Sequence, residues 1–169
     1  SINIVGFDIK PSKIIRSLGV VIDERMSFNE HVNAVCQSCY YHIRAFRHIR
    51  NSLTQETAVS VARCIVLSRL DYCNALLFGA TQVNIRKLQR IQDFLVRVVF
   101  NLPPRTSVES SLRELHWLPV QKRIIYKIGL LTFKCKHNLA PKYLSELIQD
   151  YVPVRYLRTS DANLLVETK

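Results

Sequence analysis

Glycine is scarce in this chain of 169 residues, with four in all. The turn clusters that separate the strands of all-β proteins are also few, and both absences favour long helices. No apolar run approaches the roughly 20 residues that a membrane-spanning helix needs. Residues 1–8 contain no basic stretch followed by an apolar one, so we expect no signal peptide and no membrane partner.

Familiar catalytic motifs are absent as well. The chain has no Gly-rich phosphate loop, no His-Glu-x-x-His and no Gly-x-Ser-x-Gly sequence. Two-metal nucleotidyl transfer needs paired carboxylates that hold two ions about 3.5–4 Å apart, and the chain has no Asp-Asp dipeptide on a strand turn to supply them. We therefore expect no catalytic residue, no metal site, no cofactor and no small-molecule substrate in this chain.

The five cysteines form an odd set, which is typical of reduced thiols in an intracellular protein, nuclear or cytoplasmic. Cys36 and Cys39 are three residues apart, so on a helix both could bind one Zn²⁺. No nearby histidine follows them at a zinc-finger spacing, and both lie on or beside an apolar stripe. Buried structural thiols are the favoured interpretation, and a zinc or redox protein is the alternative.

Basic residues are in excess and unevenly distributed. The net charge is +11; residues 1–85 carry +3 and residues 86–169 carry +8. Residues 115–145 contain six basic residues and no acidic one. A local field of one sign attracts polyanions, although a plain solvated surface is the alternative. The side chains predicted to contact phosphates are Arg44, Arg47 and Arg50 at the end of a first long helix, and Lys122, Arg123, Lys127 and Lys134 further along. Trp117, Tyr126 and Phe133 are interleaved with the later group; their helical spacing predicts core positions, and stacking platforms for bases are the alternative.

Hydrophobic periodicity predicts a mostly α fold, a helical bundle with a short N-terminal β-hairpin or strand element. Short strands are expected within residues 1–26, and a helix is expected from Ser27, which has Glu30 at capping-box spacing. A second helix should begin after Thr54 and run to Leu77. Further helices are expected over 83–101, 107–115, 119–137 and 141–150, with a stop at residues 103–104. The predicted divisions are strands at 1–26, a bundle at 27–103, a helical extension at 104–150 and an extended tail at 151–169.

Asp71 is a lone carboxylate in the most apolar predicted helix, where an unpaired charge would be costly. We expect it to pair with a Lys or Arg from residues 115–145 and, with Asn74, to form a buried polar latch between helices. A catalytic role for this carboxylate is the alternative. His116 lies beside Trp117 at a helix junction and is expected to be a packing residue, because no acid–base partner follows from its spacing.

Three stretches together resemble one protein family. They are residues 18–23 (LGVVID) with 26–28 (MSF) and 31–32 (HV), residues 68–79 (SRLDYCNALLFG), and residues 112–120 (LRELHWLPV). Residues 88–92 (LQRIQ) and 139–144 (LAPKYL) add to the resemblance. The chain is similar to the region that follows the polymerase palm in LINE-type (non-LTR) retrotransposon reverse transcriptases of the jockey and chicken-repeat kind.

This resemblance implies that residues 1–26 are the last strands of a palm, and that the helices form a thumb and a C-terminal extension. Such a thumb grips template–primer nucleic acid, so the implied partners are an RNA or RNA–DNA duplex and the palm and fingers of the parent polymerase. Asp71, Asn74, His116 and Trp117 match as structural residues. The family's Mg²⁺-binding Asp pair would lie upstream, so we expect this chain to be a piece truncated at both ends and not an enzyme alone. The alternatives are a domesticated protein-interaction module, with Trp117 and residues 118–120 as its surface, and a non-functional remnant of a decayed element.

Overall fold

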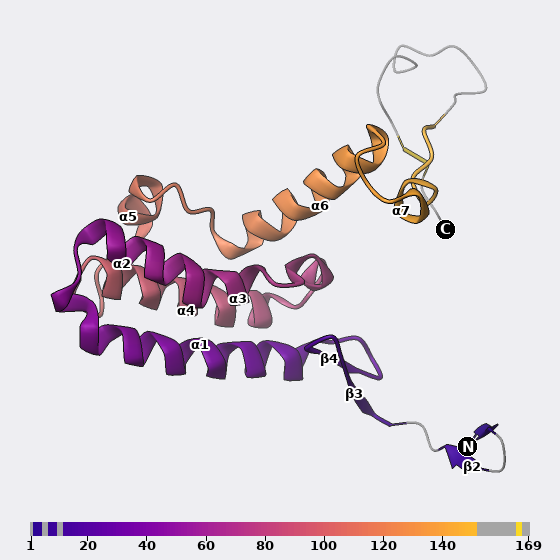
Figure 1. Ribbon diagram of the computed structural model, residues 1–169, viewed down its shortest axis with the longest axis horizontal. Helices are drawn as coiled ribbons and strands as arrows, with labels where there is room; N and C mark the ends of the chain where they lie inside the picture. The colour runs from indigo at the N-terminus through magenta and orange to yellow at the C-terminus, as the bar shows by residue number, and fades with distance from the viewer. Residues whose placement is uncertain (1, 5–6, 10–11, 152–164, 167–169) are drawn as a thin grey trace. The chain divides into compact units, whose positions relative to one another are not determined.

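The computed structural model describes residues 2–4, 7–9, 12–151 and 165–166, and the chain forms two compact units, residues 1–124 and residues 125–169. The fold is mostly helical with short N-terminal antiparallel strands, so the predicted fold class is confirmed (Figure 1). In the part of the chain that the structure describes, no helix is long and apolar enough to cross a membrane.

The N-terminal strands form two hairpins. Strand β1 (Ile2–Ile4) pairs with β2 (Phe7–Ile9), and β3 (Ile14–Ser17) pairs with β4 (Val20–Asp23), both antiparallel. Leu18 and Gly19 connect β3 to β4, and both have positive φ angles (46° and 83°), as a two-residue type I′ turn requires. The Tyr72 hydroxyl donates a hydrogen bond to the Leu18 carbonyl oxygen (2.6 Å), which ties this turn to the helices.

Helix α1 (Asn29–Ile49) begins differently from the prediction. Ser27 does not cap it, because Phe28 occupies the N-cap position with a left-handed backbone (φ 57°). The Ser27 hydroxyl donates instead to Asp23 Oδ2 (3.0 Å), and the Asp23 carboxylate also accepts from the backbone N–H groups of Arg25, Ser27 and Phe28. These bonds lower the pKa of Asp23, with the Ser27 backbone N–H as the largest cause. Asp23 therefore organises the entry to α1.

The predicted second helix is interrupted, so the prediction of a single helix that reaches Leu77 was wrong. Helix α2 (Gln55–Ala62) is capped by Thr54, as predicted, since Thr54 Oγ1 accepts from the Thr57 N–H (3.3 Å). A π-helical turn, η2 (Arg63–Leu67), leads into α3 (Ser68–Asp71). The helix ends at Tyr72, which has an extended backbone (ψ 119°), and a 3₁₀ turn, η3 (Asn74–Leu77), follows after Cys73, which has a left-handed backbone (φ 52°).

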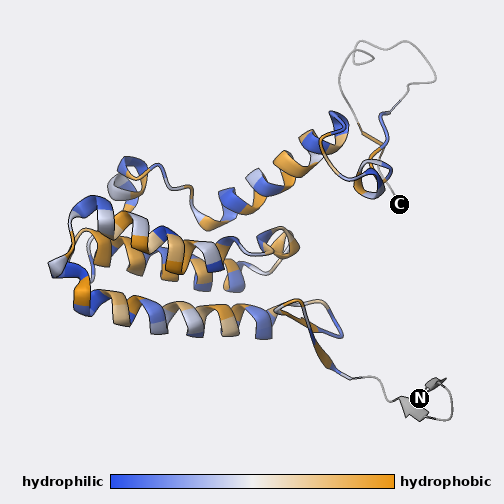
Figure 2. Cartoon of the chain, in the orientation of Figure 1, coloured by the Kyte–Doolittle hydropathy of each residue, from blue (hydrophilic) through white to orange (hydrophobic). Residues whose placement is uncertain are grey.

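Residues 1–124 share one hydrophobic core. Helix α1 packs along α4 (Gln82–Val99), and both helices present hydrophobic residues at helical spacing (Figure 2). The core continues beyond residues 103–104 into α5 (Glu109–Glu114) and the start of α6 (Val120–Lys136), so the predicted division after residue 103 does not separate two cores. The core residues that follow this point are Val108, Leu112, Leu115, Trp117, Val120 and Ile124.

Residues 125–169 contain the rest of α6 and α7 (Lys142–Ser145), which is shorter than the predicted helix 141–150. Asp150 forms an isolated antiparallel bridge with Leu165, and its carboxylate pairs with Lys136 Nζ (2.8 Å). Most of the predicted tail, residues 152–164 and 167–169, lies outside the described residues.

The end of α5 explains the sequence Leu115-His116-Trp117. His116 has a left-handed backbone (φ 54°), and its N–H donates to the Arg113 carbonyl oxygen (3.0 Å). The Trp117 N–H donates to the Leu112 carbonyl oxygen (2.9 Å), and the side chains of Trp117 and Leu112 are buried in the core. This pattern is a Schellman motif, in which glycine usually occupies the position of His116. Asn101 and Asn138 take the same position at the ends of α4 and α6.

Candidate nucleic-acid interface

Two of the three predicted α1 arginines are exposed. Arg44 and Arg47 are three residues apart, so they share one face near the C-terminal end of the helix. Arg47 also lines a pocket of about 210 Å³ together with Arg97, and no acidic residue lines it. Both arginines are available to an anionic partner.

Arg50 is not available, which corrects its assignment as a phosphate contact. Its side chain is buried, and its Nε donates to the Val99 carbonyl oxygen (2.8 Å). Its two terminal nitrogens donate to the Leu53 carbonyl oxygen and to Gln55 Oε1. A guanidinium can donate to several carbonyl oxygens at once, so Arg50 holds together the segments that meet at the end of α1 and does not face solvent.

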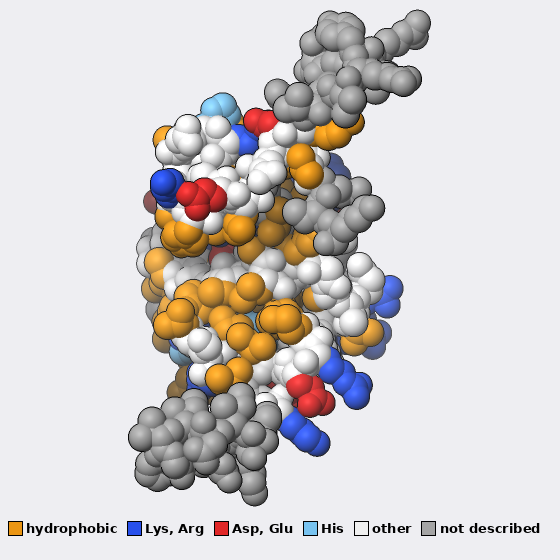
Figure 3. Space-filling model, turned by 90° about the vertical axis from the view of Figure 1, so that its right-hand side faces the viewer, with side chains coloured by type: hydrophobic (Ala, Val, Ile, Leu, Met, Phe, Trp, Pro, Cys, Tyr) orange, Lys and Arg blue, Asp and Glu red, His pale blue; other side chains and the backbone are white. Residues whose placement is uncertain are grey.

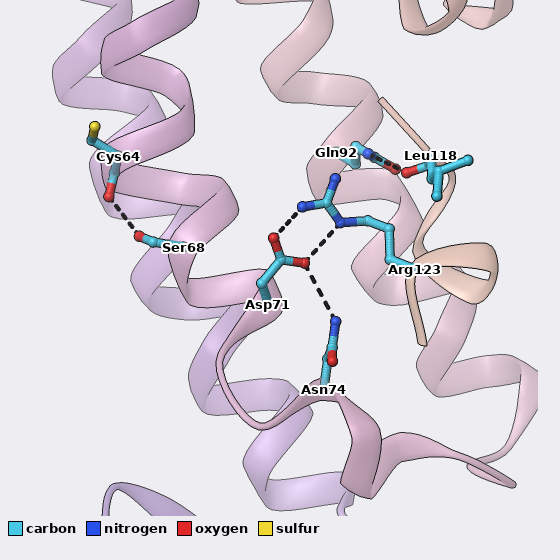
Figure 4. Close-up of polar contacts among 7 residues, drawn as sticks. All are labelled: Cys64, Ser68, Asp71, Asn74, Gln92, Leu118 and Arg123. Carbon is cyan, nitrogen blue, oxygen red and sulfur yellow. Dashed lines mark hydrogen bonds and ion pairs between the residues drawn. The ribbon is translucent and has the colours of Figure 1, made fainter. Parts of the chain in front are cut away.

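Arg123 is also withdrawn from the predicted phosphate contacts, because it is the partner of Asp71 (Figure 4). Its Nε donates to Asp71 Oδ1 (2.7 Å) and its Nη2 donates to Oδ2, a bidentate arrangement. Asn74 Nδ2 donates to the same carboxylate (3.3 Å). The predicted pairing of Asp71 with a cation from residues 115–145 is thereby confirmed. The latch is less buried than expected, since 41% of the Asp71 side chain is exposed against 18% for Arg123.

Two glutamines of α4 hold the segment that leads into α6. Gln92 is fully buried, and its Nε2 donates to the Leu118 carbonyl oxygen (2.9 Å; Figure 4). Gln89 Oε1 accepts from the Val120 N–H (2.9 Å), one of the N–H groups left free at a helix start. These bonds and the latch fix the first turn of α6 in the first unit. Trp117 lies in the core beneath this segment, as predicted, whereas His116 is exposed.

The predicted lysines of α6 are exposed: Lys122 in its first turn, and Lys127 and Lys134 further along. In the described part of the chain, no acidic group forms an ion pair with any of the three. Lys127 and Lys134 are seven residues apart, two helical turns, so they lie on the same side of the helix.

Two aromatic side chains beside these lysines are exposed, although their spacing favoured core positions. Tyr126 and Phe133 are 61% and 54% exposed, not core residues. The Phe133 ring lies against the His137 ring, with centroids 4.1 Å apart. We call the set of Tyr126, Lys127, Phe133 and Lys134 the basic–aromatic face of α6. Its rings can stack on bases and its ammonium groups can contact phosphates.

The cysteines form no metal site in the described residues, where no group of three His, Cys, Asp or Glu side chains could hold an ion. Cys39 is fully buried in α1, and burial raises the pKa of its thiol to about 12. Burial also raises the pKa of Cys36. Both thiols are therefore protonated at neutral pH, a form that binds metals poorly.

No protein-family model, curated protein or solved structure matches this chain.

Proposed function

We propose that this chain grips nucleic acid through its phosphate backbone, as the thumb-like part of an RNA-directed DNA polymerase whose catalytic carboxylates lie outside it. The basic–aromatic face of α6 is the observation that carries the proposal. Lysines with no acidic neighbour release counterions when they contact phosphates, which favours binding. Exposed aromatic rings add stacking that does not depend on sequence.

The resemblance to non-LTR reverse transcriptases is separate support. Its second block contains Asp71 and Asn74, and its third contains the end of α5 and the Trp117 core contact. These residues build the latch and the α5–α6 junction, whereas the basic–aromatic face lies outside all the resembling stretches. The sequence resemblance and the chemistry of α6 thus point to the same function through different residues.

The test compares two variants of equal net charge. Lys127→Gln with Lys134→Gln removes two charges from the face, and Lys13→Gln with Lys142→Gln removes two exposed charges elsewhere. Binding of a short RNA–DNA hybrid and of a B-form DNA duplex is measured by fluorescence anisotropy across a range of salt concentrations. On B-form DNA each lost contact reduces the slope of log K against log salt by about 0.9, so the first variant loses about 1.8.

The control variant is expected to keep nearly the whole slope, because Lys142 already has Glu146 beside it (3.7 Å). Equal slopes for the two variants would mean that binding depends only on the net charge of the chain, and would contradict a specific role for α6. Affinity that does not depend on salt would contradict the whole proposal. Phe133→Ala should weaken binding to single-stranded RNA more than binding to duplex, because only unpaired bases can stack on the ring.

Exposed hydrophobic side chains favour a second, protein partner. Exposed hydrophobic side chains are visible in Figure 3, and in the first unit large ones occur on the β3–β4 hairpin, in η3 and at the residues that follow. Such a patch is typical of an interaction surface. It does not include Trp117, which is buried. We propose that it contacts the preceding palm of the parent polymerase. Addition of a recombinant palm should protect Leu18 and Phe78 amides from hydrogen exchange at high salt, and unchanged exchange would contradict this contact.

A further inference from the structure

A cleft of about 550 Å³ lies in the first unit, and none of its lining residues belongs to the basic–aromatic face. Three elements form its walls. The β3–β4 hairpin contributes Arg16, Gly19 and Val21; α1 contributes His31, Ala34, Val35 and Ser38; and the segment around α3 contributes Ser68, Arg69 and Tyr72. A volume of this size is within the range of small-molecule sites, about 300–1,000 Å³.

Both charged residues that line the cleft are cations, Arg16 and Arg69, and no acidic side chain lines it. Arg69 is held in place, because its Nε donates to Ser38 Oγ (3.1 Å) and its Nη1 donates to the Ile65 carbonyl oxygen (2.6 Å). Its Nη2 has no hydrogen-bond partner in the described residues. An arginine fixed in this way loses little side-chain entropy when it binds an anion.

His31 adds a neutral donor. Its Nδ1 accepts a hydrogen bond from the Val21 N–H (3.5 Å), so the neutral ring carries its proton on Nε2. Burial lowers the pKa of His31, which keeps the ring neutral at pH 7. The remaining lining includes the Tyr72 ring and the aliphatic side chains of Val21 and Val35. The cleft therefore combines anion-binding groups with a wall suited to a flat apolar ring.

We infer that this cleft binds a phosphorylated ligand of nucleotide size, with the phosphate at Arg16 and Arg69 and the base against Tyr72. Two sources carry this chemistry: a free nucleotide and the unpaired terminal nucleotide of a strand. The inference does not rest on the proposed binding of nucleic acid by α6, since none of the residues that line the cleft belongs to the basic–aromatic face. Loss of one activity leaves the other measurable.

The test is a titration of the full 169-residue chain with uridine 5′-monophosphate, followed by amide chemical shifts. We expect shifts at Gly19, His31 and Ser38, and binding at least tenfold weaker for uridine, which lacks the phosphate. Arg16→Glu should raise the Kd at least tenfold. Arg16 is exposed, so this variant keeps its fold, and Arg63→Glu, at another exposed arginine, is the matched control and should leave the Kd unchanged.

Three results would overturn the inference: equal affinity for wild type and Arg16→Glu, an equal loss in Arg63→Glu, or shifts confined to residues outside the cleft. A 5′-phosphorylated trinucleotide then separates the sources. Competition with the mononucleotide at similar or higher affinity assigns the cleft to a strand end, and failure to compete assigns it to the free nucleotide. The Arg16→Glu variant should still bind hybrid duplex through the basic–aromatic face of α6, with only the small loss of affinity that its lower net charge causes.

Discussion

The latch between Asp71 and Arg123 offers a direct test of what holds the first turn of α6 in place. Asp71→Asn keeps the shape of the side chain and removes its charge. Arg123 is then left 18% exposed, with one weak acceptor in place of a bidentate carboxylate. A hydrogen bond to a charged group contributes about 1.5–3 kcal/mol when it is shielded from water. Since 41% of Asp71 is exposed, water replaces part of this interaction, and we expect a loss of about 2 kcal/mol in the free energy of unfolding.

Urea denaturation followed by tryptophan fluorescence is the appropriate assay. Trp117 is the single tryptophan, is buried, and lies three residues before α6, so it reports on the part that the latch secures. Asp71→Asn, Arg123→Met and the double variant form a thermodynamic cycle. We expect a coupling energy of about 1–2 kcal/mol, because each single variant leaves one partner without the other.

Asn74→Ala is the control, since the hydrogen bond from Asn74 to Asp71 is longer (3.3 Å) and the Asn74 amide is neutral. It should cost less than Asp71→Asn. Additive losses in the cycle, or a loss below about 0.5 kcal/mol for Asp71→Asn, would refute the reasoning and make the pair an ordinary surface contact.

Other residues give shorter tests. His116→Gly should raise the free energy of unfolding by about 0.5–1 kcal/mol in the same urea assay, because glycine adopts the left-handed backbone without strain; no gain would argue against the Schellman motif. The pKa of Asp23 is lowered from 3.8, so its contribution to stability is present above about pH 4 and is lost as the pH falls through the lower folded value. The stability of Asp23→Asn, measured by urea denaturation at several pH values, should therefore fall less on acidification than that of the wild type, and parallel curves would contradict this role. Iodoacetamide at pH 8, with mass spectrometry, should label the exposed Cys64 quickly and Cys39 only in denaturant, because the pKa of Cys39 is about 12 and its thiol is buried; rapid labelling of Cys39 in the folded chain would contradict its place in the core.

The sequence by itself determined the parts that depend on local geometry. Apolar residues three and four apart defined α1, α4 and α6, and Thr54 marked the start of α2. The cost of an unpaired charge was enough to predict that Asp71 needs a cation, and the run of basic residues limited the choice to a stretch of 31 positions that includes Arg123.

Only the tertiary structure decided which side chains are available. Arg44, Arg47 and Arg50 look equivalent in sequence, yet Arg50 bonds to Val99, 49 positions away. Tyr126 and Phe133 have the spacing of core residues and are exposed instead. Periodicity tells which residues share a side of a helix, but packing against distant segments decides whether that side is buried. The cleft between the β3–β4 hairpin, α1 and α3 is of the same kind, because its residues, 16 to 72, come together only once the hairpin has packed on the helices.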